Sequence, residues 1–598
     1  GGGSTGGGST GGGSTGGGST GGGSTGDGST GGGSTGGGST GGGSTGGGST
    51  GGGSTGGGST GGGSTGGGST GGGSTGGSSS GGTVTPPPIT ITPTNLNPPT
   101  SGEIKAPATV DKNGNASVTV TDKTVADAIK KAQDEAKKNG TEKNGVSVEL
   151  NVDTGKKAPN SISAKLPKAV QDSLVENKVS EFKIVSEAAN LTFDSKALQE
   201  IHKQAGGDVT INASKADVSK LSKEAQNEIG NRPVFNLSIT GKDGKNISDF
   251  GGGSATVSIP YTLKKDENPN NLQAYFIDAQ GKLHEVTCTY DPVTKCMVFV
   301  TNHFSTYGIG YKANAPKFSD IEKHWAKNDI EFVTARGLLS GTDKATFSPN
   351  TAMTRGMFVT ALGRLAGADV SGYKKSSFAD IKSTDYFIGY VEWASKNGIV
   401  EGTSATTFAP NAAISRQEMA VIMTNYAKTM NYTLPKTRTA VTFADSTNIA
   451  SWASEAVKSM QMAGVIMGKD GNRFDPTCTA TRAEVSAVLR RYVELVIDKA
   501  TAQGLDVNDS GKIVYYENGK LFTGTKTIDG ASYTFDRNGE TADVPKNLKH
   551  TTHTVVANES WGIIAHKYGC SAAELAGLNN KTVFDVIHPG DVLKVPKK

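Results

Sequence analysis

Residues 318–357 read FSDIEKHWAKNDIEFVTARGLLSGTDKATFSPNTAMTRGM, and the same pattern returns from residues 378 and 443. Each copy opens with Phe-x-Asp, continues through an aromatic residue, two glycines and Phe-x-Pro, and closes on a Ser/Thr-Arg pair. The arginines of these pairs, Arg355, Arg416 and Arg482, are 61 and 66 residues apart (416 minus 355, 482 minus 416). Such a period predicts a repeat architecture, in which units too small to bury themselves pack on one another.

Each repeat is expected to contain two helices. Asp320 is placed to cap the first helix through its carboxylate, and Gly337 takes the left-handed position that ends it. Thr354 is placed to cap the second helix. A Ser/Thr-x-x-Glu capping box is complete only in the other two copies, as Ser415 with Glu418 and Thr481 with Glu484, because the first copy has Met357 there.

These units resemble S-layer homology (SLH) domains, which anchor surface proteins of Gram-positive-type bacteria, and three tandem copies are typical of that family. The copies span 318–375, 378–436 and 443–500. The resemblance implies an all-α triplet, a pseudo-threefold helical assembly whose grooves bind a secondary cell-wall polysaccharide, commonly ending in a pyruvylated sugar. The family's Thr-Arg-Ala-Glu is intact only at 481–484, so we expect the first groove to bind less well.

A pyruvate ketal places a carboxylate on a sugar, which a forked guanidinium matches with two hydrogen bonds while an aromatic ring can stack on the sugar face. The resemblance implies that arginines bind the carboxylate, aromatic residues line the pockets and aspartates order the loop. In that order, the residues are Arg355, Arg416 and Arg482; Trp325, Tyr386 and Trp452; and Asp320, Asp380 and Asp445. The alternative is that the arginines pair with acidic neighbours and the aromatic residues belong to the core.

The C-terminal residues 551–597 predict a strand, two short helices and a closing strand. This module resembles a LysM domain, a βααβ fold that grips N-acetylglucosamine-containing chains such as peptidoglycan. The resemblance implies a groove formed by Asn558, Glu559, Ser560 and Trp561 opposite Leu578, Asn579, Ile587 and His588. The alternative for Trp561 is a place in the core, since this position is often apolar in the family.

Residues 506–545 carry two predicted hairpin turns, Asn518-Gly519 and Asn538-Gly539. The segment resembles the hairpin repeats that bind choline or glucans between successive copies. Only one copy is present and the usual Trp is missing, so we interpret the segment mainly as a structured spacer.

The N-terminal end differs in composition from the rest of the chain. Residues 1–75 repeat Gly-Gly-Gly-Ser-Thr with one exception at Asp27, which leaves nothing to bury. We therefore expect a disordered low-complexity arm over 1–82, followed by a stiffer Pro/Thr-rich stalk over 83–107. The chain begins inside a repeat and without an initiator Met, so we expect it to be a fragment of a longer product.

Residues 108–312 predict a mixed α/β and then β-rich surface region. Helices are expected at 122–139, 168–176, 195–205 and 214–228, and strands at 118–121, 146–152, 182–185, 209–211, 234–239, 255–259, 272–277 and 297–301. Cys288 and Cys296 flank a predicted hairpin around Asp291-Pro292. On facing strands they form either a cross-strand disulfide or two free thiols.

Composition and motifs exclude several function classes. A net charge of +4 over 598 residues, with no basic stripe, argues against a nucleic-acid binder, and no apolar run is long enough to span a membrane. We find no metal-ligand spacing, phosphate loop or nucleophile elbow, so we expect no cofactor, no metal and no enzyme activity.

One motif suggests chemistry. His303-Phe304-Ser305 resembles the self-cleaving junction of receptor autoproteolysis domains, where the hydroxyl attacks the preceding carbonyl and His acts as base. The alternative is a plain strand with an exposed Ser305.

The sequence thus predicts a non-catalytic extracellular protein of the cell wall or S-layer, which binds secondary wall polysaccharide and peptidoglycan and displays its N-terminal region outward. The competing interpretation is the anchoring half of a wall-remodelling enzyme whose catalytic domain lies upstream of Gly1. Self-association and the ligand of 108–312 stay open.

Overall fold

The structure is a computed structural model. It describes residues 98–596 apart from 156–158, 293, 499–503, 529–530, 542–549, 557–558, 569–571, 580, 582 and 584. The predicted disordered arm over 1–82 and most of the predicted stalk over 83–107 lie outside these residues. The chain divides into two units, Gly1–Gly81 and Gly82–Lys598, and every described residue belongs to the second. No helix among the described residues is long and apolar enough to cross a membrane.

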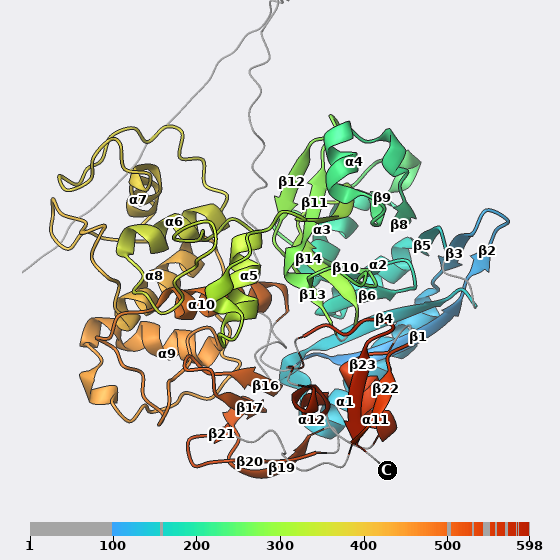
Figure 1. Ribbon diagram of the computed structural model, residues 1–598. Helices are drawn as coiled ribbons and strands as arrows, with labels where there is room; N and C mark the ends of the chain where they lie inside the picture. The colour runs from blue at the N-terminus through green and yellow to red at the C-terminus, as the bar shows by residue number, and fades with distance from the viewer. Residues whose placement is uncertain are drawn as a thin grey trace, which may run out of the picture. The chain divides into compact units, whose positions relative to one another are not determined.

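The described part of 100–311 forms two mixed sheets (Figure 1). The first has the order β1 (Thr100–Pro107), β4 (Val146–Asp153), β6 (Glu181–Val185), β7 (Asn190–Asp194), β10 (Ala255–Pro260), β14 (Cys296–Thr301) and β13 (Cys288–Asp291). The second has the order β12 (Leu283–Val286), β11 (Leu272–Ile277), β15 (Thr306–Tyr311), β9 (Val234–Thr240), β8 (Val209–Lys215), β5 (Ser161–Leu166), β3 (Asn115–Thr119) and β2 (Thr109–Val110). The β1/β4, β4/β6 and β3/β5 pairs are parallel.

Apolar residues from both sheets share one core with helices α1 (Asp122–Asn139), α2 (Lys168–Glu176) and α3 (Ser195–Ala205). The three helices were predicted at these positions and are confirmed. The cap predicted for α1 is present: the Thr121 hydroxyl accepts the Thr124 N–H, and Gly140 ends the helix with φ 64°.

The helix predicted over 214–228 is wrong in its first half. Strand β8 pairs with β9 as far as Lys215, and Asp217 then caps a short 3-10 turn at Val218–Lys220. The real helix α4 (Lys223–Ile229) begins only after Ser222, whose hydroxyl accepts the Ala225 N–H.

Residues 327–497 are helical, and each repeat contributes two helices to one shared core. The pairs are α5 (Lys327–Ala335) with α6 (Arg355–Leu365), α7 (Ile388–Lys396) with α8 (Arg416–Thr429), and α9 (Ser454–Ala463) with α10 (Arg482–Ile497). The predicted capping boxes of α8 and α10 are present, whereas in α6 the Thr354 hydroxyl accepts the Met357 N–H without a returning carboxylate.

Backbone hydrogen bonds join the three repeats in a closed cycle just before the second helix of each. Ile414 N–H donates to Met353 O (2.9 Å), Ala480 N–H to Ile414 O (2.9 Å), and Met353 N–H to Ala480 O (2.8 Å). Each repeat therefore contacts both others through the same backbone positions, and residues at equivalent positions can be compared directly.

The segment after α10 forms a small sheet in the order β16 (Gly504–Val507), β17 (Ile513–Glu517) and β18 (Lys520–Leu521), with β21 (Glu540–Thr541) also on β17. The predicted Asn518-Gly519 hairpin is confirmed, because Glu517 pairs with Lys520. The predicted turn at Asn538-Gly539 is also present, because the Gly539 N–H donates to Asp536 O (2.9 Å) and the Asp536 N–H to Glu540 O (2.8 Å). The strands on either side pair elsewhere: β20 (Ala531–Phe535) pairs with β19 (Gly524–Ile528), and β21 pairs with β17. Met467 of repeat 3 packs with Val514 and Tyr516, so this sheet contacts the repeats directly.

The C-terminal module contains β22 (His550–Thr554), α11 (Trp561–Tyr568), α12 (Ala572–Leu578) and β23 (Val592–Pro596). Strands β22 and β23 pair in antiparallel fashion, from His550 with Pro596 to Thr554 with Val592. A separate apolar cluster with Trp561, Ile564, Leu575 and Val595 forms its core.

Candidate functional site

The three predicted aspartates share one task. Asp320 accepts the backbone N–H groups of Phe347 (3.0 Å) and Ser348 (2.7 Å). The equivalent pairs are Asp380 with Phe408 and Ala409 (2.9 and 2.7 Å), and Asp445 with Phe474 and Asp475 (both 2.8 Å). The carboxylates thus order the Phe-x-Pro turn, whose middle residue is left-handed in every repeat, with φ of 60°, 58° and 54°.

The prediction that Asp320 caps the first helix is wrong. Helix α5 begins after Ala326, which makes no side-chain cap, and both oxygens of Asp320 are already used by the Phe347-Ser348 turn. The Asp320 carboxylate therefore binds a turn that lies 27 and 28 residues further along the chain, and not the start of the adjacent helix.

The three predicted arginines also occupy equivalent positions. Each starts the second helix of its repeat and reaches the following repeat in the cycle, where the guanidinium lies over the Phe of the Phe-x-Pro turn at 4.3–5.1 Å. Arg355 Nε donates to Phe408 O (3.1 Å), Arg416 Nε to Phe474 O (2.7 Å) and Arg482 Nε to Phe347 O (2.9 Å). All three are buried, with exposed fractions of 6%, 0% and 4%.

A second carbonyl bond is shared as well. The Nη2 atoms of Arg355, Arg416 and Arg482 donate to the carbonyls of Glu401, Met467 and Ser340, each of which directly precedes the second glycine of its repeat. The arginines therefore contribute to the contacts between repeats, whatever else they bind.

Acidic neighbours distinguish the three positions. Arg355 Nη1 lies 3.1 Å from Glu418, and Arg416 lies 2.7 Å from Asp509 and 3.6 Å from Glu484. No carboxylate of the described residues lies within ion-pair distance of Arg482, and burial lowers the pKa of its guanidinium. Pairing with acidic neighbours, the alternative from the sequence, thus applies to two of the three.

The predicted aromatic residues are not equally accessible. Tyr386 and Trp452 expose 58% and 59% of their surface, whereas Trp325 is half-buried beside Gly511 of the small sheet. Sugar stacking needs an open ring face, and the first two provide one.

In the C-terminal module, several predicted groove residues are used within the fold. Trp561 is 6% exposed and its indole N–H donates to Asp585 O, so this side chain is part of the core. Glu559 is hydrogen-bonded to His553 (2.6 Å), and Ser560 accepts the Ile563 N–H. Asn558 lies outside the described residues.

The predicted opposite wall follows the same trend. The Asn579 side chain donates to Leu575 O (2.7 Å) and bonds both backbone groups of Lys594. Ile587 is buried and Leu578 is half-buried, and the His588 N–H donates to Asp591 (2.9 Å). His588 Nε2 is buried without a hydrogen-bond partner among the described residues.

Family models match the three repeats and the C-terminal module. The S-layer homology domain matches residues 317–356, 377–420 and 442–486, and the LysM domain matches residues 553–596. The chain carries three SLH domains and one LysM domain. Both kinds of domain attach proteins to cell-wall glycans, which places this chain at the cell surface or in the wall.

Curated relatives include surface-layer proteins and enzymes. The chain is 27% identical over 238 residues to the surface-layer 125 kDa protein of Lysinibacillus sphaericus and 28% identical over 179 residues to the S-layer protein sap of Bacillus anthracis. It is also 27% identical over 370 residues to an amylopullulanase of Thermoanaerobacterium thermosulfurigenes. These matches cover 38%, 29% and 59% of this chain, and the chain spans only about a fifth of each relative (19%, 21% and 19%).

The cysteine pair of the N-terminal region does not form the disulfide considered from the sequence. Cys288 and Cys296 are buried free thiols. They do lie on paired strands, but the register places Cys288 opposite Phe299 and Cys296 opposite Asp291, three positions along the ladder. Three residues of strand span about 10 Å, beyond the reach of a disulfide.

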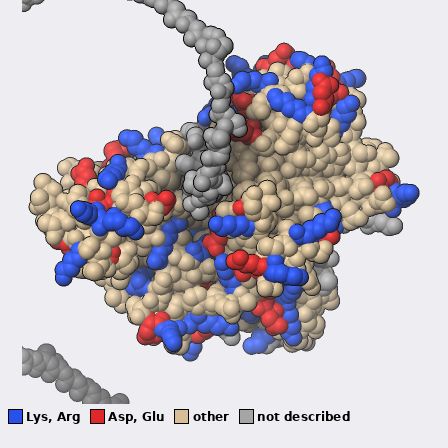
Figure 2. Space-filling view, turned by 90° about the horizontal axis from the view of Figure 1, so that it is seen from above, with Lys and Arg blue, Asp and Glu red and all other residues tan. Residues whose placement is uncertain are grey.

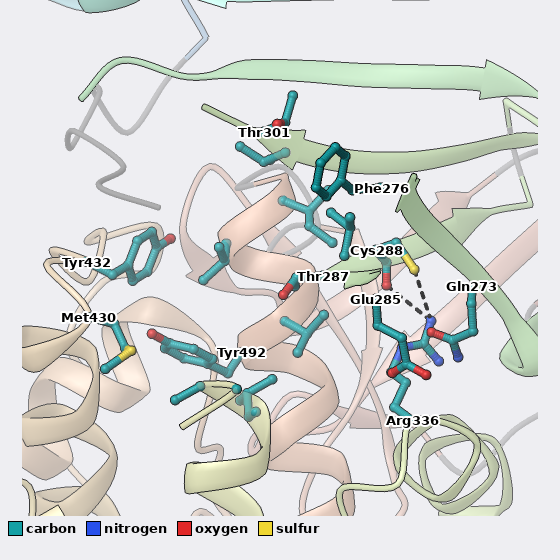
Figure 3. Close-up of a pocket in the computed structure, with 18 of the residues that line it drawn as sticks. Gln273, Phe276, Glu285, Thr287, Cys288, Thr301, Arg336, Met430, Tyr432 and Tyr492 are labelled. Carbon is teal, nitrogen blue, oxygen red and sulfur yellow. Dashed lines mark hydrogen bonds between the residues drawn. The ribbon is translucent and has the colours of Figure 1, made fainter. Parts of the chain in front are cut away.

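The residues considered for self-cleavage lie beside a cavity of about 360 Å³, which is lined from β11–β15 and by residues of the SLH helices (Figure 3). His303 contacts Asn302 (3.0 Å) and Tyr307 (3.4 Å) through its two ring nitrogens, and burial lowers its pKa. Ser305 bonds Leu237 N–H through its backbone carbonyl. Cleavage at Phe304-Ser305 stays a prediction.

The Arg336 side chain also lines this cavity, and its guanidinium is hydrogen-bonded within the protein. Arg336 donates to the backbone carbonyls of Asn270 (3.0 Å) and Cys288 (3.1 Å), as the dashed lines to Cys288 in Figure 3 indicate. The described residues contain no cluster of His, Cys, Asp or Glu that could hold a metal ion. On the face shown in Figure 2, Lys and Arg are interspersed with Asp and Glu.

Proposed function

We propose that this chain is a non-catalytic surface protein anchored to the wall of a Gram-positive-type bacterium by two unlike glycan-binding units. The observation that carries the proposal is the presence of three SLH domains and one LysM domain on one chain. Two weak contacts on one chain raise the overall affinity without tighter single sites.

In this proposal the SLH domains, over 318–375, 378–436 and 443–500, form a pseudo-threefold assembly that binds a carboxylate-bearing wall polysaccharide, with a pyruvate ketal as the expected carboxylate. The equivalent arginines are the candidates for the carboxylate contact, because guanidinium forks match carboxylates and each is held rigidly by two carbonyls. The carboxylates that already surround two of them make the three positions unequal.

The LysM domain over 551–597 then binds N-acetylglucosamine-containing peptidoglycan as a βααβ fold. Its predicted groove residues largely hold the fold together, so the contact surface is expected to use backbone groups and exposed atoms of the module. The segment 506–545 braces the repeats, and 108–312 is displayed outward from the wall.

A second candidate function is the anchoring part of a wall-associated enzyme. It is favoured by relatives named as glycan-degrading enzymes, such as the amylopullulanase, of whose length the chain spans about a fifth. In that case the catalytic domain would lie upstream of Gly1.

Sedimentation of the full chain with purified Gram-positive walls tests the proposal. We expect the chain to sediment with intact walls and to lose most of this binding after acid removal of the secondary polysaccharide, with a remainder retained through the LysM domain. Unchanged binding after stripping would transfer the anchor to the LysM domain, and binding to neither wall would overturn the proposal.

A further inference from the structure

A loop from outside the repeats occupies the Arg416 position. Asp509 lies between β16 and β17, is 2% exposed, and accepts hydrogen bonds from Arg416 Nη2 (2.7 Å) and from the Met467 backbone N–H (3.0 Å). Its other oxygen accepts Arg491 Nη1 (2.7 Å). A carboxylate from another part of the chain is thus held by two guanidinium groups and a backbone amide.

The same loop covers the aromatic residue of that position. A Cβ on Gly511 would lie 2.8 Å from Cβ and Cγ of Trp325, so the loop backbone rests against this side chain. Asn508 fixes the loop by accepting the backbone N–H groups of Ser510 (3.0 Å) and Lys512 (2.9 Å). The loop Asn508–Gly511 therefore presents a carboxylate to Arg416 and packs its backbone against the base of the Trp325 side chain.

We propose that Asn508–Gly511 is an internal ligand of the Arg416 position, and that the equivalent Arg482 position takes an external carboxylate-bearing sugar in the same manner. This proposal rests on the proposed wall-anchoring function and narrows it to one arginine. The equivalence follows from the shared carbonyl bonds, in which Ser340 corresponds to Met467.

At the Arg482 position the matching donors are free. The Ser340 N–H, which corresponds to the Met467 N–H that binds Asp509, makes no hydrogen bond to the described residues. Arg482 Nη1 also has no partner among them and is not sealed from solvent, whereas Arg416 Nη1, likewise without a hydrogen bond, is fully buried 3.6 Å from Glu484. A cation that is 96% buried and keeps an unpartnered, solvent-reaching donor is suited to an external anion.

The sequence explains why this position is open. The capping-box glutamate of the next repeat in the cycle lies beside Arg355 and Arg416, as Glu418 and Glu484. For Arg482 the corresponding residue is Met357, which carries no charge. The missing glutamate thus frees Arg482, rather than weakening the arginine of its own repeat.

The surroundings favour a sugar over a simple anion. Tyr386 lies within electrostatic range of both Arg482 and Arg364, and more than half of its surface is open. The Asp320 carboxylate also lies within electrostatic range of Arg482, but not at ion-pair distance, and both of its oxygens accept backbone N–H groups. An arginine, an amide donor and an exposed ring match a carboxylate attached to a pyranose. A pyruvate ketal and a uronic acid share this chemistry.

Calorimetric titration of the full chain tests the proposal with three probes: a hexosamine glycoside carrying a pyruvate ketal, a glucuronic acid glycoside, and the hexosamine glycoside without the ketal. The variants are Met357→Glu, which places a carboxylate beside Arg482, and Met357→Gln, which has nearly the same shape and no charge. The Glu variant should unfold at the wild-type temperature or above, because it completes the capping box with Thr354.

We expect wild type and Met357→Gln to bind at least one carboxylate probe equally, and Met357→Glu to bind it about tenfold more weakly or worse. The probe that binds identifies the source of the carboxylate. Equal affinity of the Glu and Gln variants would overturn the inference while leaving wall anchoring intact. Failure of wild type to bind any probe, with walls still bound, would overturn it too, and failure on walls as well would overturn the proposed function.

Discussion

The Arg416 and Arg482 positions have the same scaffold but differ in the carboxylates that surround the arginine. Both guanidinium groups hold two carbonyls of the next repeat and lie over a phenylalanine ring. Arg416 is enclosed by Asp509 and Glu484, whereas Arg482 forms an ion pair with no carboxylate of the described residues. The repeat motif therefore places the arginine, and two departures from the repeat decide which ligands it can bind. These are the loop Asn508–Gly511 at Arg416 and Met357 at Arg482.

The largest effect is expected when the arginine of the Arg416 position is replaced. Arg416→Gln would remove the guanidinium that Asp509 and Glu484 share, although Arg491 still pairs with Asp509 and Lys469 with Glu484. The free energy of unfolding of the helical part should therefore fall by about 3 kcal/mol in denaturant titration, the lower end for a broken buried pair. Arg482→Gln leaves no buried carboxylate behind and should cost about 1 kcal/mol. Equal losses in the two variants would contradict the assigned difference.

The turns that bind Asp320, Asp380 and Asp445 are expected to contribute equally to the free energy of unfolding in all three repeats. Asp380→Ala removes two charge-assisted bonds to backbone N–H groups, and should lower the free energy of unfolding by about 2–3 kcal/mol. Asp320→Ala should cost about the same, and the exposed neighbour Lys382→Ala should cost less than about 0.5 kcal/mol. Unequal losses at the two aspartates would indicate that the turns are not equivalent.

Affinity for walls should depend on the open position. We expect Arg482→Gln to weaken wall binding by about thirtyfold, and Arg482→Lys to restore part of it, because Lys keeps the charge and loses the fork. Sedimentation at increasing wall concentrations measures both. Unchanged binding in Arg482→Gln would move the ligand to another position.

A smaller difference in sugar affinity is expected between variants of the two exposed aromatic residues, Tyr386 and Trp452. Tyr386→Ala should weaken binding of the carboxylate-bearing sugar by about tenfold, the order expected for loss of one aromatic contact. Trp452 is equally exposed, but it belongs to a position whose arginine is paired with Glu418, so Trp452→Ala should change affinity by less than about twofold. The same calorimetric titration distinguishes the two, and a reversed order would contradict the assignment of the ligand to Arg482.

The smallest effect concerns stability alone. Met357→Glu completes the capping box that α8 and α10 already have, and should raise the free energy of unfolding by about 0.5–1 kcal/mol. Met357→Gln is the control without charge. A loss of stability in the Glu variant would show that the repeats are not equivalent at this residue.

The sequence predicted the features that depend on local signals. Helix α1 follows from its cap and apolar periodicity, α2 and α3 were predicted at the positions they occupy, and the repeats follow from spacing. The 214–228 helix failed because two local caps and a strand pairing divide the segment. The disulfide considered from the sequence failed because the register, which the sequence leaves open, offsets the cysteines.

The candidate site was predicted only in its parts. The arginines, aromatics and aspartates were identified by the repeat, and Met357 was noted as a departure. That Met357 takes the glutamate's place at the Arg482 position, and that Asp509 reaches Arg416 across 93 residues of chain, depend on the cyclic packing of the repeats. Contacts of that range carry no signal in a single sequence, although an acidic residue in a tight Asn-Asp-Ser-Gly loop was visible.

The stoichiometry of ligand binding tests the central claim most directly. A full-chain calorimetric titration with the carboxylate-bearing glycoside should give one site per chain, because among the three arginines of the described repeats only Arg482 has no carboxylate at ion-pair distance. Two or three equivalent sites would contradict the claim, since the carboxylates at Arg355 and Arg416 would then be displaced by ligand.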